Sequence, residues 1–251
     1  MIPTQILRVL STIRTFDVPA LLMGGQACVL YGAAEYSRDL DLAVLASPEA
    51  WPKLTEAMRA LRSTVIAVPP FEALYMERGH GVHLSVPDER SPALRVDLMS
   101  RMRGVDSFDA LWERRVTIVL PSETMGDVAV EMLGLEDLVA AKKTQRDKDW
   151  PMIRRLVDAS YAAGRDGDVT DHQVAFWLAE LRSPEFLHEL VVRFPEAAVR
   201  SDRAAVGAAL GGGDVAHALA AEQAREMAED ATYWRPLRRE LEALRHASRR
   251  Q

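Results

Sequence analysis

The stretch that decides the fold reads Leu21-Leu22-Met23-Gly24-Gly25-Gln26-Ala27, and after it comes Asp39-Leu40-Asp41-Leu42. Residues 19–23 are apolar and predict a short strand, and residues 26–31 predict a helix. The glycine pair therefore falls where a strand turns into a helix. Glycine has no Cβ, so the backbone can approach a ligand closely at this turn, and helix N-terminal amides favour phosphate.

A pair of carboxylates follows on the next predicted strand, residues 40–45. Because strand side chains alternate between the two faces, Asp39 and Asp41 point the same way while Leu40 and Leu42 point into the core. Two adjacent carboxylates repel each other unless a cation lies between them. Magnesium prefers oxygen ligands, commonly one or two carboxylates together with substrate phosphates. The alternative is a solvated strand edge.

A third carboxylate, Asp97, lies in the later predicted strand 94–99. Three carboxylates can hold two Mg²⁺ ions, one activating an attacking oxygen and the other neutralising a leaving pyrophosphate. His80 and His83 are an odd number of residues apart, so on a strand they would face opposite sides and would not share a metal ion.

The rest of the chain divides into a mixed part and a helical part. Up to residue 133 the patterns predict helices at 4–16, 48–61 and 108–114 and further strands at 65–68, 81–86, 116–120 and 128–132. From residue 135 almost everything predicts helix. We therefore expect an α+β protein with a small mixed-sheet domain, 1–133, followed by an all-helical C-terminal domain, 134–251.

Composition limits the classes of protein. The 251 residues are 48% hydrophobic and 27% charged, which is ordinary for a globular protein. No apolar run reaches the roughly 18 residues that span a bilayer, and the N-terminal stretch lacks the apolar core of a signal peptide, so we expect a cytoplasmic protein without a membrane partner. A net charge of −6 argues against a broad nucleic-acid footprint. The single cysteine excludes an intramolecular disulfide.

These motifs resemble the nucleotidyltransferase superfamily, which includes DNA polymerase beta and the aminoglycoside adenylyltransferases. Its mark is a Gly-Gly or Gly-Ser turn, then Asp-x-Asp, then a third Asp on a neighbouring strand. The chain is most similar to the bacterial branch of abortive-infection toxin-like proteins. The matching segments are Gly24-Gly25-Gln26-Ala27, Tyr31-Gly32 and Ser37-Arg38-Asp39-Leu40-Asp41.

The resemblance implies a role for each of these residues. Asp39 and Asp41 would bind both Mg²⁺ ions, and Asp97 would bind the catalytic one and help to draw the proton from the acceptor. The residues implied to contact the nucleoside triphosphate (NTP) in this part of the chain are Gly24, Gly25, Gln26 and Ser37. Gln26 stands where the family often has Ser or Thr, and Glu35 where relatives often carry Arg.

A second motif of the same branch follows at Lys142, Arg146 and Asp149. On one continuous helix these positions, i, i+4 and i+7, share a face. The resemblance implies that this face turns toward the triphosphate and clamps it. The alternative is an exposed helix face laced with salt bridges.

Two classes of function remain. The first is an enzyme that transfers a nucleoside monophosphate from an NTP to an acceptor and releases pyrophosphate. The acceptor is RNA, a protein or a small molecule. The second is a degenerate nucleotidyltransferase that senses a nucleotide or binds a partner protein, as half of a toxin–antitoxin pair.

Overall fold

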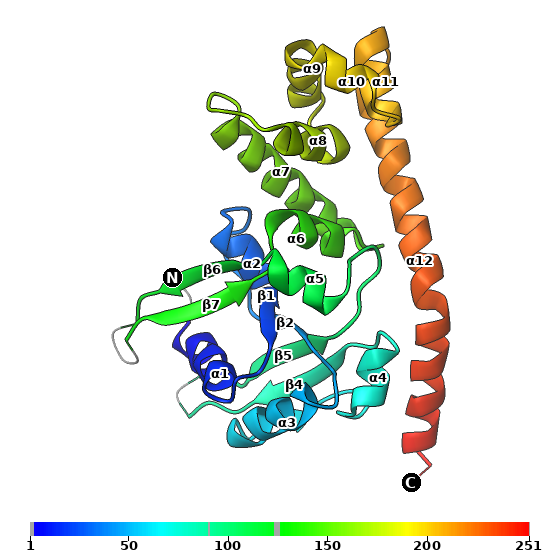
Figure 1. Cartoon of the computed structure of the whole chain (residues 1–251). Helices are drawn as coiled ribbons and strands as arrows, with labels where there is room; N and C mark the ends of the chain where they lie inside the picture. The colour runs from blue at the N-terminus through cyan, green and yellow to red at the C-terminus, as the bar shows by residue number, and fades with distance from the viewer. Residues whose placement is uncertain (1–2, 90, 123–125, 251) are drawn as a thin grey trace. The chain divides into compact units, whose positions relative to one another are not determined.

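The computed structural model describes residues 3–89, 91–122 and 126–250. Within these residues it contains seven strands, which form one sheet in the order β3-β4-β5-β2-β1-β7-β6 (Figure 1). Two of the neighbouring pairs, β2 with β5 and β1 with β7, are parallel, and the other pairs are antiparallel. The sheet is therefore mixed, and together with the helical C-terminal part it confirms the α+β class.

The strands are β1 (Ala20–Met23), β2 (Leu40–Val44), β3 (Thr64–Val65), β4 (Val82–Val86), β5 (Leu94–Met99), β6 (Val116–Leu120) and β7 (Val128–Met132). The helices among them are α1 (Thr4–Thr15), α2 (Gly24–Leu30), α3 (Ala50–Ala60), α4 (Ala73–Glu77) and α5 (Phe108–Glu113). After the last strand come α6 (Leu135–Lys142), the short 3-10 helix η1 (Asp147–Asp149), α7 (Trp150–Gly164), α8 (Asp171–Glu180), α9 (Pro184–Arg193), α10 (Pro195–Val199), α11 (Ala204–Gly211) and α12 (Val215–Ser248).

The chain forms two compact units. The sheet unit comprises residues 1–30, 34–141 and 234–251, and the helical unit comprises residues 31–33 and 142–233. These bounds differ from the predicted division after residue 133. Helix α6 belongs with the sheet because Leu138 and Val139 are buried and Asp137 forms an ion pair with Arg114, at 2.7 Å. The end of α12 joins the same unit, where Glu240 contacts His80 at 2.8 Å.

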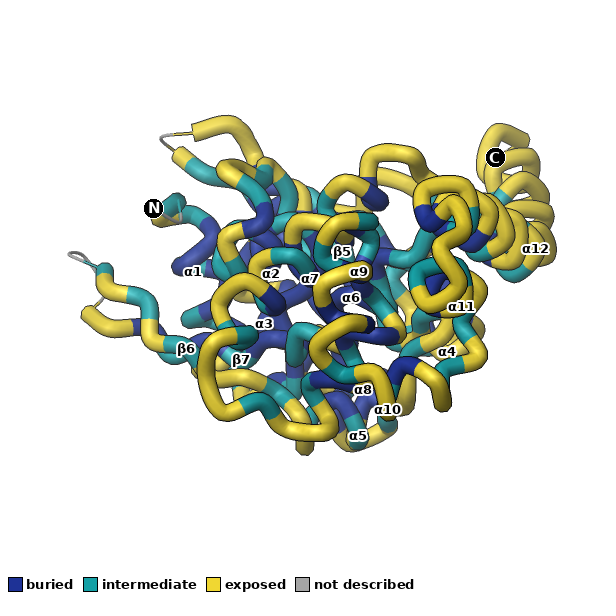
Figure 2. The backbone as a smooth tube through the Cα atoms, turned by 90° about the horizontal axis from the view of Figure 1, so that it is seen from above, coloured by how far each residue is buried: buried dark blue, intermediate teal, exposed yellow. Residues whose placement is uncertain are grey.

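The core of the sheet unit follows from the period of each element. In β5, Leu94, Val96 and Leu98 are buried while the alternate positions are more accessible. In α1, helical spacing buries one apolar stripe, and this helix packs against α3 and β7. Figure 2 shows buried segments in the interior of the molecule and the end of α12 exposed. Burial of such side chains contributes about 1.5–3 kcal/mol each.

The helical unit has its own core. Trp177 of α8 is fully buried and meets Tyr161 of α7 edge to face, with ring centroids 5.1 Å apart. Helix α8 begins at a capping box, in which Thr170 and Gln173 satisfy each other's backbone N–H groups. None of the helices in the described part of the chain is both long and apolar enough to cross a membrane.

Some predicted elements differ from the structure. Helix α2 begins at Gly24, not at residue 26, and the strand predicted at 65–68 is the two-residue β3. The sequence analysis also missed α4, a helix of five residues that buries one side chain, Met76. These elements have two to seven residues, which is too short for a helical or strand period to be recognised in the sequence.

Candidate functional site

Two of the carboxylates that the sequence singles out, Asp41 and Asp97, lie on one face of the sheet. Asp41 of β2 pairs in parallel register with Asp97 of β5, so the two side chains point to the same side. Neighbouring strands are about 4.8 Å apart, which brings the two carboxylates close together. His83 of β4 is the antiparallel partner of Asp97 and extends the row. Asp39 lies just before β2, two residues from Asp41.

The glycine turn packs directly against Asp41. The Gly25 amide donates a hydrogen bond to Oδ2 of Asp41, with a length of 3.2 Å. Gly24 has φ +64, a left-handed conformation that favours glycine, and a Cβ added there would overlap the Asp41 side chain. A Cβ on Gly25 would overlap the Ser37 hydroxyl. Both positions require glycine because Asp41 and Ser37 approach the backbone so closely. The Gly25 amide, which was expected to face a phosphate group, faces the Asp41 carboxylate instead.

The loop before β2 is tied to this turn. Gln26 is 2% exposed and donates from Nε2 to the Ser37 carbonyl oxygen at 2.8 Å. The Ser37 hydroxyl in turn donates to the Asp39 carbonyl oxygen at 3.3 Å. Gln26 and Ser37, which the resemblance assigns to nucleotide contacts, thus hold the chain that leads into the Asp39 and Asp41 segment. Their contact with a nucleotide stays a prediction.

The Asp97 carboxylate forms hydrogen bonds with two neighbouring side chains, Arg95 and His83. Its Oδ1 accepts from Nε of Arg95 at 2.8 Å and meets Nδ1 of His83 at 2.8 Å. Burial by itself would raise the pKa of Asp97, but the hydrogen bonds from His83 and Arg95 and their charges lower it on balance. Asp97 is therefore held as a carboxylate at neutral pH.

Arg95 lies within electrostatic reach of all three carboxylates. Its pKa is raised first by the hydrogen bond to Asp97, and also by the charges of Asp39 and Asp41. Arg95 precedes Asp97 by two residues on β5 and so shares its face. Neither Arg95 nor His83 was predicted as a site residue, and His83 was weighed only as one of two histidines that would not share a metal ion. The spacing of two on one strand could have indicated Arg95, whereas His83 reaches Asp97 only through the pairing of β4 with β5.

The second motif lies in the helical unit and differs from its predicted form. Helix α6 ends at Lys142, and Asp149 belongs to η1, so the motif does not lie on one helix. Hydrogen bonds of the intervening segment explain the break: Asp230 accepts from the Gln145 amide at 2.8 Å, and Thr144 accepts from the Arg146 amide at 3.2 Å. The predicted single helix is therefore wrong.

The three side chains of the motif nevertheless meet. Asp149 is 2% exposed and accepts from Nζ of Lys142 at 3.4 Å, from Nε of Arg146 at 2.7 Å and from Oγ1 of Thr144 at 2.6 Å. Lys142 is 8% exposed, so the alternative of a solvated face is also wrong for this pair, while Arg146 is exposed. These cations already neutralise a buried carboxylate. Their action on a triphosphate stays a prediction.

The donor chemistry of the sheet face fits magnesium, because carboxylate oxygens are its preferred protein ligands. In the described residues no group of three or more His, Cys, Asp and Glu side chains is arranged as a ready-made metal site. Asp41 and Asp97 are adjacent by register, but one oxygen of Asp97 is engaged by Arg95 and His83. Binding of a cation at Asp97 has to compete with these two contacts.

Comparison with solved structures finds several that resemble this chain. The chain is similar to an antigenic nucleotidyltransferase-like protein from Paracoccidioides brasiliensis. The crystal structure of that protein aligns with 74% of this chain and 95% of its own, at 13% identity and a TM-score of 0.39. No protein-family model matches the chain, and no curated protein matches it. A likeness this distant does not decide the function, so the case for a function rests on the geometry above.

Proposed function

We propose that the sheet unit transfers a nucleoside monophosphate from an NTP to an acceptor and releases pyrophosphate. The observation that carries the proposal is the register of β2 with β5, which sets Asp41 beside Asp97 on one face, next to a Gly24 that packs against Asp41. Adjacent carboxylates can bind cations, and the glycine pair beside them leaves space for a triphosphate, so the arrangement suits a cation-dependent reaction of an NTP.

Each residue has a part in this proposal. Asp39, Asp41 and Asp97 would hold two Mg²⁺ ions, which when bound would neutralise the triphosphate and activate the acceptor oxygen. Gly24 leaves room for the Asp41 side chain beside the start of α2. The hydrogen bond from Gln26 to the Ser37 carbonyl oxygen fixes the segment that leads into β2. Asp97, a carboxylate at neutral pH, is the residue placed to accept the proton of the acceptor.

The test is transfer of label. The protein is incubated with each of the four NTPs, labelled on the α-phosphate, together with Mg²⁺ and total RNA, total protein or a cationic small molecule such as an aminoglycoside. Asp41→Asn should abolish the transfer and leave the melting temperature nearly unchanged, because the Asn oxygen still accepts from the Gly25 amide. Asp202→Asn, an exposed position in the helical unit, is the matched control and should transfer normally.

Two results would count against the proposal. Transfer by Asp41→Asn at the wild-type rate would remove Asp41 from the reaction. A large drop in melting temperature of this variant would mark Asp41 as a structural residue instead. Among acceptors, the acidic charge of the chain favours a cationic small molecule, and the resemblance to the toxin-like branch favours RNA or protein.

A second candidate is the degenerate module that binds a nucleotide or a partner protein without turnover. The observation that favours it is the double engagement of Asp97 by Arg95 and His83, which supplies the positive charge that a metal ion would supply. Saturable binding of an NTP, with no label transferred to any acceptor and no pyrophosphate released, would select this function over transfer.

A further inference from the structure

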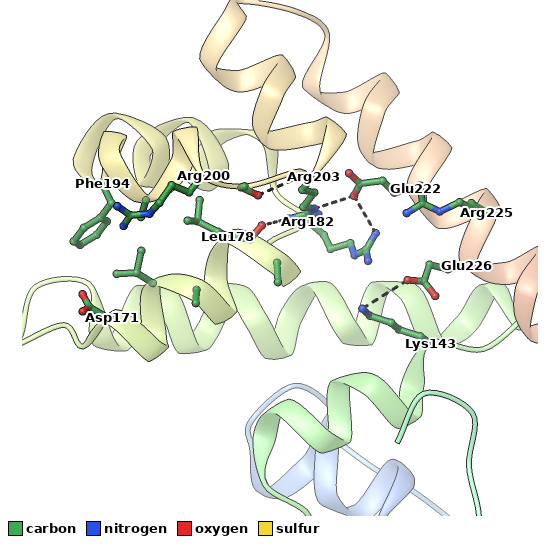
Figure 3. Close-up of a pocket in the computed structure, with 15 residues that line it drawn as sticks. Lys143, Asp171, Leu178, Arg182, Phe194, Arg200, Arg203, Glu222, Arg225 and Glu226 are labelled. Carbon is green, nitrogen blue, oxygen red and sulfur yellow. Dashed lines mark hydrogen bonds and ion pairs between the residues drawn. The ribbon is translucent and has the colours of Figure 1, made fainter. Parts of the chain in front are cut away.

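The helical unit contains a pocket whose lining includes four arginine residues, Arg182, Arg200, Arg203 and Arg225. It has a volume of about 610 Å³, within the range of small-molecule sites. Figure 3 shows its walls, which come from α8, from the segment around α10 and from α12. The lining is mixed, with Val174, Leu178 and Phe194 as apolar members among charged side chains.

Arg182 is the unusual member of this lining. Its side chain is only 8% exposed, and in the part of the chain that the structure describes its Nε and Nη1 atoms donate no hydrogen bond. The nearest carboxylate oxygens, on Glu180 and Glu222, are both 3.9 Å away. The guanidinium carbon lies 4.9 Å from the centre of the Trp150 ring, within cation–π distance. Buried N–H groups are nearly always paired, so an acceptor is to be expected here.

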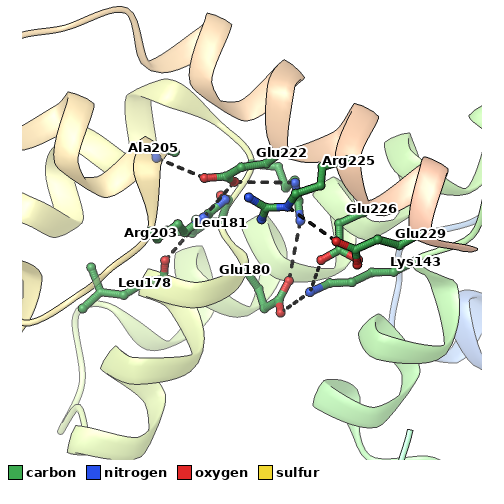
Figure 4. A network of polar contacts seen from close by, with 11 residues as sticks. Lys143, Leu178, Glu180, Leu181, Arg203, Ala205, Glu222, Arg225, Glu226 and Glu229 are labelled. Carbon is green, nitrogen blue, oxygen red and sulfur yellow. Dashed lines mark hydrogen bonds and ion pairs between the residues drawn. The ribbon is translucent and has the colours of Figure 1, made fainter. Parts of the chain in front are cut away.

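The neighbouring arginine shows the contrast. Arg203 donates to the carbonyl oxygens of Leu178 and Leu181, both at 2.8 Å, and to Glu222 at 3.0 Å. Glu222 also accepts from the Ala205 amide at 3.0 Å, so both of its oxygens are engaged (Figure 4). The acid nearest to Nη1 of Arg182 is therefore already committed to other donors.

The balance of charge points to an anionic ligand. Five cationic side chains line the pocket, Lys143, Arg182, Arg200, Arg203 and Arg225, against three acidic ones, Asp171, Glu222 and Glu226. Burial, followed by the charge of Arg203, lowers the pKa of Arg182, and the charges of Glu180, Glu222 and Glu226 oppose this shift without reversing it. An oxyanion accepting from Arg182 would supply both the missing acceptor and the missing charge.

We propose that this pocket binds a small organic oxyanion, with its carboxylate or phosphate group on Arg182 and an apolar or aromatic body against Leu178 and Phe194. The guanidinium has unpaired donors at Nε and Nη1, and each can donate a single hydrogen bond to an oxygen of a carboxylate or phosphate. The site lies wholly within residues 142–233 and uses none of the residues of the proposed transfer site. Its occupancy is therefore measurable without any turnover.

The experiment is calorimetric titration of the full chain with four defined probes: phenyl phosphate, benzoate, inorganic phosphate and benzylamine. We expect phenyl phosphate or benzoate to bind, inorganic phosphate to bind more weakly because it lacks the apolar body, and benzylamine not to bind. The comparison of phenyl phosphate with benzoate identifies the preferred headgroup.

Two variants locate the binding. Arg182→Met keeps most of the side-chain volume and removes the donors, and it should weaken binding by about 10- to 100-fold. Arg155→Met, at an exposed position on α7, is the matched control and should bind like the wild type. Because Arg182 lies 3.9 Å from carboxylate oxygens of Glu180 and Glu222, its removal is expected to lower stability, and circular dichroism checks that the variant is folded.

A third variant keeps the proposal testable if Arg182→Met fails to fold. Ala179→Phe, at an exposed position in the lining, should block the pocket without touching any charged side chain. The proposal is overturned if neither phenyl phosphate nor benzoate binds at millimolar concentration, if benzylamine binds as well as they do, or if binding survives in the folded Arg182→Met or Ala179→Phe variant.

Discussion

Replacement of Gly24 by alanine tests the contact on which the proposed site depends. Gly24 has φ +64, and a Cβ at this position would lie 2.5 Å from the Asp41 Cβ as well as overlapping its carboxylate. Rotation of the Asp41 side chain cannot relieve a clash with its own Cβ. The start of α2 must therefore move away from β2, and the hydrogen bond from the Gly25 amide to Asp41 is lost.

The magnitude follows from a matched glycine. Gly104 has φ +68, and nothing lies within 4 Å of a Cβ added there. Gly104→Ala should therefore cost only the left-handed backbone penalty, about 1–2 kcal/mol. Gly24→Ala suffers the same penalty and also loses a hydrogen bond to a charged acceptor, a further loss of about 1.5–3 kcal/mol. The difference between the two variants isolates the contact with Asp41.

The assay is urea unfolding followed by circular dichroism, together with titration of each variant with Mn²⁺ as a probe for Mg²⁺. We expect Gly24→Ala to be the less stable variant and to bind Mn²⁺ more weakly than both Gly104→Ala and the wild type. Equal losses of unfolding free energy in the two variants, with equal Mn²⁺ affinity, would refute the close packing of the turn against Asp41.

Three further predictions follow from the charged contacts. The pKa of Asp97 is lowered in the folded protein, so the ionised carboxylate stabilises the fold above about pH 4, and this contribution is lost as the pH falls through the folded pKa. The difference in unfolding free energy between wild type and Asp97→Asn should therefore shrink in acid. A difference that stays constant with pH would contradict this. Lys142→Met removes one partner of the buried Asp149 and should cost about 1–3 kcal/mol in urea unfolding. The exposed control Lys148→Met should change stability by less than about 0.5 kcal/mol, and equal losses would contradict the buried pairing. Arg95→Gln removes the cation that competes at Asp97 and should raise Mn²⁺ affinity in calorimetry, whereas unchanged affinity would show that no metal ion displaces Arg95.

The sequence by itself determined what depends on local order. The position of the glycine pair directly after β1 and the α+β class follow from local patterns and from the special backbone of glycine, and the common face of Asp39 and Asp41 stays a prediction from the period of two in strands. Each of these features involves residues only a few positions apart. Local patterning is therefore sufficient to predict them.

Only the tertiary structure decided which distant residues meet. Asp97 lies beside Asp41 because β5 pairs with β2 across the order of the sheet, and His83 joins them through the pairing of β4 with β5. Lys142, Arg146 and Asp149 do not lie on the single helix that was expected: the helix ends at Lys142, and the chain turns so that Arg146 donates to the buried Asp149 carboxylate. Strand order and turn closure depend on long-range packing and hydrogen bonds that no local period encodes. The break in the chain before Asp149 and the surroundings of Arg182 therefore became visible only once the chain was folded.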